Sequence, residues 1–394
     1  MSLQRWATDT GLRLYRLERR VDPYVRPAFD ALLRRALQAI VQAAINARRR
    51  DPLLDIAAER TLTGEAEAVG AVVEQMSRFL RREYPVPGAA QRAGNTKTYG
   101  VVRGRLEVRA DVPPQLRHGL FRAPRSYPAW VRFAGPGPLS PPDIDDYGIL
   151  SIGLKVMDVD GPKLLDDERR TQDLTGISSP TFTTRDVLAN ADLQRRVYDG
   201  TSLFHYLGRQ GYLGDLLMQV LYARTHANPL ATPYWSCVPY LLGEGQAMQY
   251  RFVPASGRIG PRRPPRPPPD DFLRSAMAAT LREREVAFDL LVQVQTDARR
   301  MPMENAAVVW PDRLSPPVRV ATLRLPAQRF DSPEQLAFAD RLAINPWHSL
   351  PEHRPLGNQN RARREIYLQL SRLRQSMNGV PHVEPTGDEF LSHL

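Results

Sequence analysis

Short strand-like segments separated by turn residues fill most of the chain between residues 95 and 330, and they constrain the fold more than any other feature. Segments of this kind, bounded by turn signals, predict β-strands. Eight mostly antiparallel strands are enough to close a barrel, which leaves no exposed sheet edge. The strands are predicted at residues 98–109, 128–134, 148–158, 171–178, 235–242, 247–254, 286–295 and 317–325.

Helical segments flank and interrupt this series. A helical stretch at about 184–226 follows the fourth predicted strand, and Thr184 can cap its first helix. We therefore predict an α+β protein, an antiparallel eight-stranded β-barrel with flanking and inserted helices. Its three regions are a helical extension (1–94), the barrel core (95–330) and a wrapping loop followed by a helix (331–394).

Two apolar stripes at helical spacing mark the N-terminal region. The simplest interpretation is two helices packed on the main body. The alternative is a basic amphipathic surface that touches membrane lipid, because arginines flank the first stripe. The first stripe is Leu33, Leu37, Ile40 and Ala44, and the second is Val72, Met76, Phe79 and Leu80.

Composition excludes several classes of protein. Apolar residues make up 42% of the chain, so a sizeable core is expected. The mean hydropathy is −0.41 and no window approaches 18 apolar residues, which excludes a transmembrane helix. Cys237 is the only cysteine, which excludes a disulfide framework and a cysteine-based zinc site. The first 20 residues lack an apolar run, so we expect a cytoplasmic protein and no secretory signal.

The net charge of +11 does not indicate a nucleic-acid partner. Only three of the 54 basic residues are lysines, and the arginines are scattered along the whole chain. A binding surface for nucleic acid is instead a clustered basic patch or stripe. We therefore expect no nucleic-acid partner.

The segment from Arg361 to Tyr367 carries the most informative chemistry. Residues 360–377 are predicted to form a helix that stops at Asn378–Gly379, and Arg363 and Tyr367, four apart, share one of its faces. A tyrosine binds ferric iron as phenolate, and an adjacent guanidinium favours that anion. Alone this pattern is weak, and an exposed arginine beside a half-buried tyrosine is the ordinary alternative.

The chain resembles the haem-dependent catalase-related superfamily, and in particular its smaller, divergent bacterial members. The resemblance covers roughly residues 95–377 and rests on six segments in the same order. They include the first barrel strand, a V-R-F strand, the segment before the inserted helices and the loop that precedes the R-x-x-x-Y helix. The segments are NTKTYGVVRGRLEV (95–108), GLF with YPAWVRF (119–121 and 127–133), YGILSIGLKV (147–156), TQDL with SPTFTTRD (171–174 and 179–186), INPWHSLPEHRPLG (344–357) and RARREIY (361–367).

The resemblance implies that the barrel holds one haem b. Tyr367 would be the axial ligand of the haem iron, and Arg363 would keep its phenolate ionised. Arg132 would pair with a haem propionate, since guanidinium and carboxylate suit each other. A structural ion pair is the alternative role for Arg132. Lys97 would substitute as a second propionate partner, because the family's upstream arginine matches Thr96.

The residues expected on the distal side, the face of the haem opposite Tyr367, differ from those of the family. Tyr99 stands at the position of the distal histidine, and a phenol is a poor general base near pH 7. The distal asparagine matches Ser178, with Ile177 and Ser179 as register alternatives, and Ala134 replaces a serine. General acid–base catalysis contributes about 10²–10⁴-fold. We therefore expect weak catalase activity, with Tyr99, Ser178 and Arg363 as the catalytic candidates.

The expected function is a haem-dependent oxidoreductase that acts on a peroxide or on an organic or lipid hydroperoxide. A genuine but slow catalase or peroxidase and a non-enzymatic haem-binding protein are the alternatives. Family members commonly self-associate, so the resemblance implies a homo-oligomer. The basic N-terminal helices add a peripheral membrane contact to the expected partners.

Overall fold

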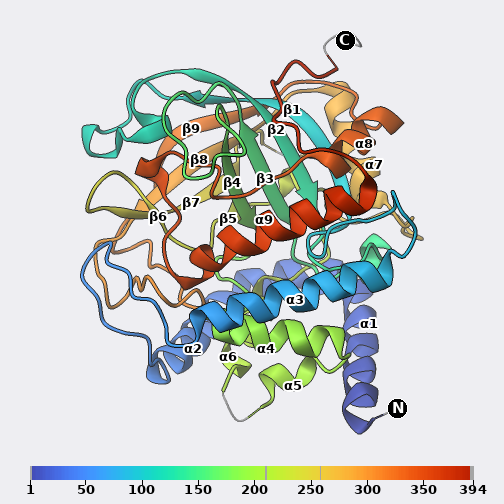
Figure 1. Cartoon of the computed structure of the whole chain (residues 1–394). Helices are drawn as coiled ribbons and strands as arrows, with labels where there is room; N and C mark the ends of the chain where they lie inside the picture. The colour runs from blue at the N-terminus through green and yellow to red at the C-terminus, as the bar shows by residue number, and fades with distance from the viewer. Residues whose placement is uncertain (1, 209–210, 258, 391–394) are drawn as a thin grey trace.

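One antiparallel sheet closes on itself at the upper end of the molecule (Figure 1). The computed structural model describes residues 2–208, 211–257 and 259–390. Within them the strand order is β5-β4-β3-β2-β1-β9-β8-β7-β6, with β5 also paired to β7. The strands are β1 (Thr98–Val108), β2 (Ser126–Ala134), β3 (Ser151–Val156), β4 (Gln172–Ile177), β5 (Tyr234–Trp235), β6 (Tyr240–Leu241), β7 (Ala247–Pro254), β8 (Val286–Val294) and β9 (Val318–Leu325).

The strand predicted over 235–242 is interrupted. Its two ends, β5 and β6, both pair with β7, and the chain between them takes a left-handed turn at Cys237 (φ 61°). A non-glycine residue at this φ cannot continue a strand. Counting β5 and β6 as one broken strand, the barrel has the eight antiparallel strands that the sequence predicts.

The seam between β4 and β7 is closed partly by a side chain. Strand β5 pairs with β4 only at Ile177 and Trp235, so backbone groups of β4 beyond that point lack a strand partner. The hydroxyl of Tyr250 on β7 accepts from the amide of Thr175 (2.9 Å) and donates to its carbonyl (3.0 Å). A buried phenol thus satisfies backbone groups that a continuous strand would otherwise pair.

The inside of the barrel is a packed core. Phe133, Tyr234 and Phe288 have ring centroids 6.0–6.3 Å apart, and all three side chains are fully buried. Barrels of eight strands have an interior just wide enough for side chains to fill. These three rings fill their part of the interior, so a cofactor would have to lie elsewhere.

Helices cover the lower end and one side of the barrel (Figure 1). Helices α4 to α6 form the predicted insertion, but Asp186 caps it: its carboxylate accepts from the amide of Ala189 at 2.8 Å. Thr184 does not cap, because its hydroxyl accepts from the Gln359 amide instead. The helices are α1 (Leu3–Leu32), α2 (Arg34–Ala47), α3 (Glu65–Glu83), α4 (Val187–Tyr198), α5 (Leu203–Tyr206), α6 (Leu213–Tyr222), α7 (Phe272–Glu283), α8 (Pro333–Arg341) and α9 (Asn358–Asn378).

Of the two predicted N-terminal stripes, one is buried and the other is exposed. On α3, Val72, Phe79 and Leu80 are buried against α9 and α4, as predicted. On α2, the stripe that contains Leu37 and Ile40 faces solvent, and the opposite face packs on α6. The prediction that this stripe packs on the body is wrong. Apolar periodicity shows that a helix has an apolar face, but it does not show whether another element covers that face.

Two further helices were not predicted, α7 and α8. Residues 331–343 were expected to be loop-like, but Ser332 caps α8 by accepting from the amide of Gln335 at 3.2 Å. None of the helices in the described part of the chain combines the length and the apolarity needed to cross a bilayer.

Candidate functional site

Helix α9 carries the tyrosine and the arginine that the sequence singled out. It begins and ends within two residues of the prediction, and Gly379 at φ 63° terminates it. Arg363 is buried, and its guanidinium lies 5.1 Å from the centre of the Phe182 ring and donates to Asn360 Oδ1 at 3.1 Å. Tyr367 is half-buried, and among the described residues its hydroxyl has no hydrogen-bond partner.

The charge of Arg363 is matched to its neighbours. Burial alone would lower the pKa of its guanidinium, but the nearby groups of Tyr367, Tyr240 and Cys237 outweigh burial and raise that pKa. The cation is therefore retained next to the Tyr367 phenol.

The first turn of α9 is held in place by buried ionic contacts. Gly357 precedes it at φ 81°, where a Cβ would lie 2.5 Å from the carbonyl oxygen of Met303. Arg361 then forms ion pairs with three carboxylates, at 2.8 Å to Glu59, 2.7 Å to Glu65 and 3.0 Å to Glu304. This network fixes the rotation of α9 and hence the direction of Arg363 and Tyr367.

Three more arginines gather near Tyr367 with few negative partners. Arg132 donates to Thr98 Oγ1 (2.7 Å) and to the carbonyl of Asn95 (2.7 Å), and burial lowers its pKa to about 10. Arg374, two turns after Tyr367, is 4% exposed, and burial lowers its pKa to about 10 as well. In the part of the chain that the structure describes, its guanidinium has no hydrogen-bond partner.

Arg92 is the third member of this arginine cluster, which we define as Arg92, Arg132 and Arg374. Burial lowers the pKa of Arg92, and the charges of Arg132 and Arg374 lower it further. Its carboxylate contact is a long one, 4.0 Å from Nη1 to Asp340, whose side chain is 61% exposed. Buried cations without close anions are costly. The arginine cluster is therefore suited to a ligand that brings carboxylates or other anionic groups.

The predicted partner Lys97 is engaged elsewhere. Its ammonium lies 2.6 Å from Asp143 and donates to the carbonyls of Pro141 (2.7 Å) and Asp270 (2.6 Å). The hydroxyl of Ser178 accepts from the amide of Leu150 at 2.9 Å, which binds β4 to the start of β3. Neither side chain contacts Tyr367 or Arg363 in the described residues.

Tyr99 points into the barrel and is fully buried. Its hydroxyl donates to Asp146 Oδ2 at 2.8 Å. Burial is the main cause that raises the pKa of Tyr99 well above its usual value and that of Asp146 to about 6. The phenol is therefore a hydrogen-bond donor and no proton acceptor near neutral pH.

A small pocket of about 180 Å³ opens beside Tyr367, between α9 and the loop that follows α8. Its lining includes Tyr367, Ser371 and Gln375 from α9 and His348 from the loop. Pockets that bury ligands of drug size measure about 300–1,000 Å³. The pocket is therefore too small to enclose a porphyrin as it stands.

A buried ionic network borders this pocket. Lys155 lies 2.9 Å from Asp173, and His348 Nδ1 lies 2.9 Å from the same carboxylate. Glu168, Asp173 and His348 bring one ligand atom each close enough to hold a metal ion. The Lys155 ammonium already pairs with both carboxylates, however, so we interpret the group as an ion-pair network.

Comparison with known proteins identifies the architecture. No protein-family model and no curated protein sequence matches the chain. A bacterial catalase structure matches with a TM-score of 0.55 and 14% identity, over 85% of this chain and 67% of the catalase. A fungal catalase crystal structure matches with a TM-score of 0.58 and 14% identity, over 86% of this chain and 68% of the catalase. The fold is catalase-like. At 14% identity the similarity establishes the fold alone. The chemistry of the chain has to be inferred from its side chains.

Within this catalase-like fold, the sequence reasoning missed three residues of the site. Arg374 lies seven residues after Tyr367 on the same face of α9, a spacing that could have identified it. Arg92 precedes β1 in a segment without regular structure, and nothing in its neighbourhood marks it. Asp146 lies among other aspartates in a loop, and only folding brings it to Tyr99.

Proposed function

We propose that the protein binds haem b through Tyr367 and acts as a haem-dependent oxidoreductase on a peroxide or on an organic or lipid hydroperoxide, with weak catalase activity. The observation that carries this proposal is the free Tyr367 hydroxyl next to the buried Arg363 on a firmly anchored helix. The catalase-like fold supports the same conclusion.

The donor set fits haem b. A ferric iron requires an anionic oxygen donor, and Arg363 favours that state of Tyr367. The two propionates of haem require cations, and the arginine cluster supplies three guanidiniums that lack close carboxylates. Arg132 and Arg374 would hold the propionates, with Arg92 beside them. Lys97 would take no part, because Asp143 neutralises it.

The available space adds a requirement. The pocket beside Tyr367 is smaller than a porphyrin, so its walls must separate when haem enters. One wall belongs to α9, which the Arg361 network anchors, and the other to the loop around residues 343–348. His348 and Asn345 also hold this loop to Asp173, so the proposal requires one of two anchored walls to move.

Bound haem would supply an iron that exchanges electrons with the O–O bond of a peroxide. Arg363 would hold negative charge at Tyr367 Oη. The Tyr99 hydroxyl stays protonated and donates a hydrogen bond to Asp146. It therefore cannot take the proton of hydrogen peroxide as a general base does. Rapid disproportionation of hydrogen peroxide needs such a base, whereas cleavage of an organic hydroperoxide depends less on it.

Absorption spectroscopy of the full chain titrated with ferric haem tests the binding. The wild-type protein should give a saturable ferric spectrum, and Tyr367→Phe should lose or change its high-spin bands. Tyr24→Phe is the matched control, since Tyr24 is exposed on α1. An unchanged spectrum for Tyr367→Phe would show that Tyr367 is not the ligand.

A comparison of two substrates tests the activity. Oxygen evolution from hydrogen peroxide should be slow, and consumption of a polyunsaturated fatty-acid hydroperoxide should be faster. Vigorous oxygen evolution would favour a genuine catalase and contradict the role assigned to the distal side. Tyr99→His should increase oxygen evolution.

A non-enzymatic haem-binding protein is the second candidate. One observation favours it: the hydroxyl of Tyr99 is directed to Asp146, and that of Ser178 accepts from the amide of Leu150. No distal side chain among these is free to assist a substrate. Saturable haem binding without consumption of either peroxide would select this candidate.

A further inference from the structure

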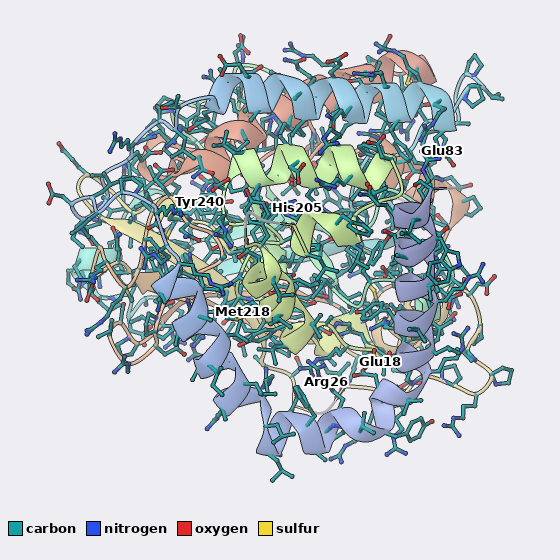
Figure 2. The ribbon with its side chains drawn as sticks, turned by 90° about the horizontal axis from the view of Figure 1, so that it is seen from below. Glu18, Arg26, Glu83, His205, Met218 and Tyr240 are labelled. Atoms are coloured by element: carbon teal, nitrogen blue, oxygen red, sulfur yellow. The ribbon has the colours of Figure 1, made fainter. Side chains whose placement is uncertain are left out.

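The N-terminal helices expose an unusual amount of apolar surface. Viewed from below, α1 and α2 frame the lower end of the molecule around α4 to α6 (Figure 2). Of the 23 large apolar residues exposed in the described part of the chain, eleven lie in residues 3–40. They are Leu3, Trp6, Leu14, Leu17, Val21, Tyr24, Val25, Leu32, Leu33, Leu37 and Ile40.

The eight of these residues between Leu3 and Leu32 form a stripe along one face of α1, and Leu37 and Ile40 lie on α2. Leu14, Leu17 and Val21 follow one another at spacings of three and four, and their exposed fractions are 63%, 59% and 54%. The opposite face, with Arg19 and Asp22, is buried against the body: Asp22 accepts from the amide of Thr225 at 2.7 Å. Arg263 and Arg266 cover the ring of Tyr24, at 4.4 and 4.2 Å from its centre. The other side chains of the stripe are exposed in the part of the chain that the structure describes.

Helix α6 adds to this surface. It lies against α2 and exposes Leu213, Leu217 and Val220 at spacings of four and three. Exposed apolar side chains gathered on neighbouring helices are typical of a site of interaction. We name the α1 stripe with these three residues the lower apolar surface.

Arginines border the lower apolar surface. Arg13 and Arg20 lie four residues before and three after Leu17, so they flank the stripe on α1. Arg13 and Arg16 are exposed and have no carboxylate partner among the described residues, whereas Arg20 pairs with Asp145 at 3.2 Å. Residues 1–50 contain eleven arginines and four acidic residues.

We propose that the lower apolar surface docks on an anionic lipid bilayer, with its apolar side chains in the interfacial layer and the flanking arginines against the headgroups. An amphipathic helix with arginines beside its apolar face binds such surfaces in the plane of the interface. This inference does not depend on haem.

Charge favours lipid over a second copy of this chain. A two-fold pairing of α1 with itself would bring Arg13 and Arg16 of both copies to one interface, beside Arg20, which Asp145 already pairs. Glu18 is the only acidic residue between them on the helix, so the repulsion would not be balanced. An anionic bilayer neutralises all of these arginines at once.

Vesicle sedimentation with the full chain tests the proposal. The protein should sediment with vesicles of phosphatidylcholine and phosphatidylserine, much less with phosphatidylcholine alone, and less as salt is raised. Leu14→Glu/Leu17→Glu should weaken binding by about tenfold or more, because it removes buried apolar area and adds repulsion. Leu53→Glu/Val383→Glu, at residues equally exposed but outside the surface, should bind like the wild type.

A second pair of variants separates the charge contribution. Arg13→Gln/Arg16→Gln removes two arginines without a carboxylate partner, so the fold should be unaffected, while vesicle binding and its salt dependence should both decrease. Absence of wild-type binding to anionic vesicles would overturn the proposal. So would an oligomer that dissociates in Leu14→Glu/Leu17→Glu without any vesicle binding, since a second copy would then cover the surface.

Discussion

The hydroxyl of Tyr99 donates a 2.8 Å hydrogen bond to the carboxylate of Asp146, and both side chains are buried. The backbone passes close to this pair: a Cβ on Gly135 would lie 2.8 Å from the Tyr99 hydroxyl and 2.7 Å from Asp146 Oδ2. The pair is therefore sealed on that side. The residue at the expected distal position serves a buried carboxyl group, which explains why it cannot act as a base.

Tyr99→Phe should lower the free energy of unfolding by about 1.5–3 kcal/mol at pH 7.5, because Asp146 loses a hydrogen bond to its charged form. The pKa of Asp146 is about 6, so the loss should be smaller at pH 5, where the carboxyl group is protonated in the folded protein. Denaturant unfolding at both pH values measures this. Tyr84→Phe, whose hydroxyl makes an exposed 3.4 Å contact to Gln91, should change stability little. Equal losses at both pH values would contradict the charge assignment.

Arg374→Met should stabilise the haem-free protein by about 1–4 kcal/mol and weaken haem binding. The guanidinium is buried without a carboxylate partner, so its removal relieves an uncompensated charge. The same charge is the one that a propionate would neutralise. Thermal unfolding and haem titration measure the two effects.

Arg185→Met is the matched control for that experiment. Arg185 forms a 2.8 Å ion pair with the buried Asp215, and its loss should destabilise the protein by about 3–5 kcal/mol. If Arg374→Met destabilises the haem-free protein to the same degree, the view of the arginine cluster as an unfilled anion site is wrong.

Stability should fall as the pH rises from 7 to 9.5 because of His348. Hydrogen bonds to Asp167 and Asp173 outweigh burial and raise its pKa from 6.5 to about 9. A raised pKa contributes stability that is fully present below 6.5 and is lost as the pH passes 9. The shift corresponds to about 3 kcal/mol. Denaturant unfolding across this range should show a fall in the wild type that is absent or reversed in His348→Asn, because Lys163, whose pKa burial lowers to about 8, titrates in both proteins.

His353 provides the contrast. Burial lowers its pKa to about 4, so it is neutral throughout this range, and His353→Asn should leave the slope unchanged. A wild-type stability that is flat between pH 7 and 9.5 would show that His348 is not charged in the folded protein.

Arg361→Met should destabilise the protein by about 3–5 kcal/mol, because Glu65 and Glu304 would lose their ion pair with Arg361 and Glu59 would keep only its pair with Arg354. Arg78→Met removes an exposed ion pair on α3 and should cost about 0–1 kcal/mol. Chemical unfolding of both variants measures the difference. A small effect at Arg361 would mean that packing alone holds the start of α9.

Local patterns predicted the parts of the fold that short-range physics dictates. Alternation and turn residues located the barrel strands, and helical periodicity with a glycine stop located α9. The interruption at Cys237 was missed because its left-handed backbone depends on a contact between distant segments, a thiol donating to the carbonyl of Ser179 at 2.9 Å. Helix α8 was missed because its start depends on the cap at Ser332 more than on an apolar stripe.

The same contrast between local patterns and contacts of distant segments applies to the candidate site. Arg363 and Tyr367 were found because four residues on one helix make a local unit, and the expectation for Arg132 placed it near them. Lys97 could not be judged from its position beside Thr96, since its partner Asp143 is 46 residues away along the chain.

The sequence by itself determined the strand and helix pattern, the R-x-x-x-Y pair and the resemblance that predicted a catalase-like fold, because each of these depends on spacing along the chain. Only the tertiary structure decided which charges are neutralised. Asp143 pairs with Lys97 and Asp146 accepts a hydrogen bond from Tyr99, while Arg132 and Arg374 are left without carboxylates. The cost of a buried charge depends on what lies within a few ångströms of it in space, and that is settled only when distant segments pack together.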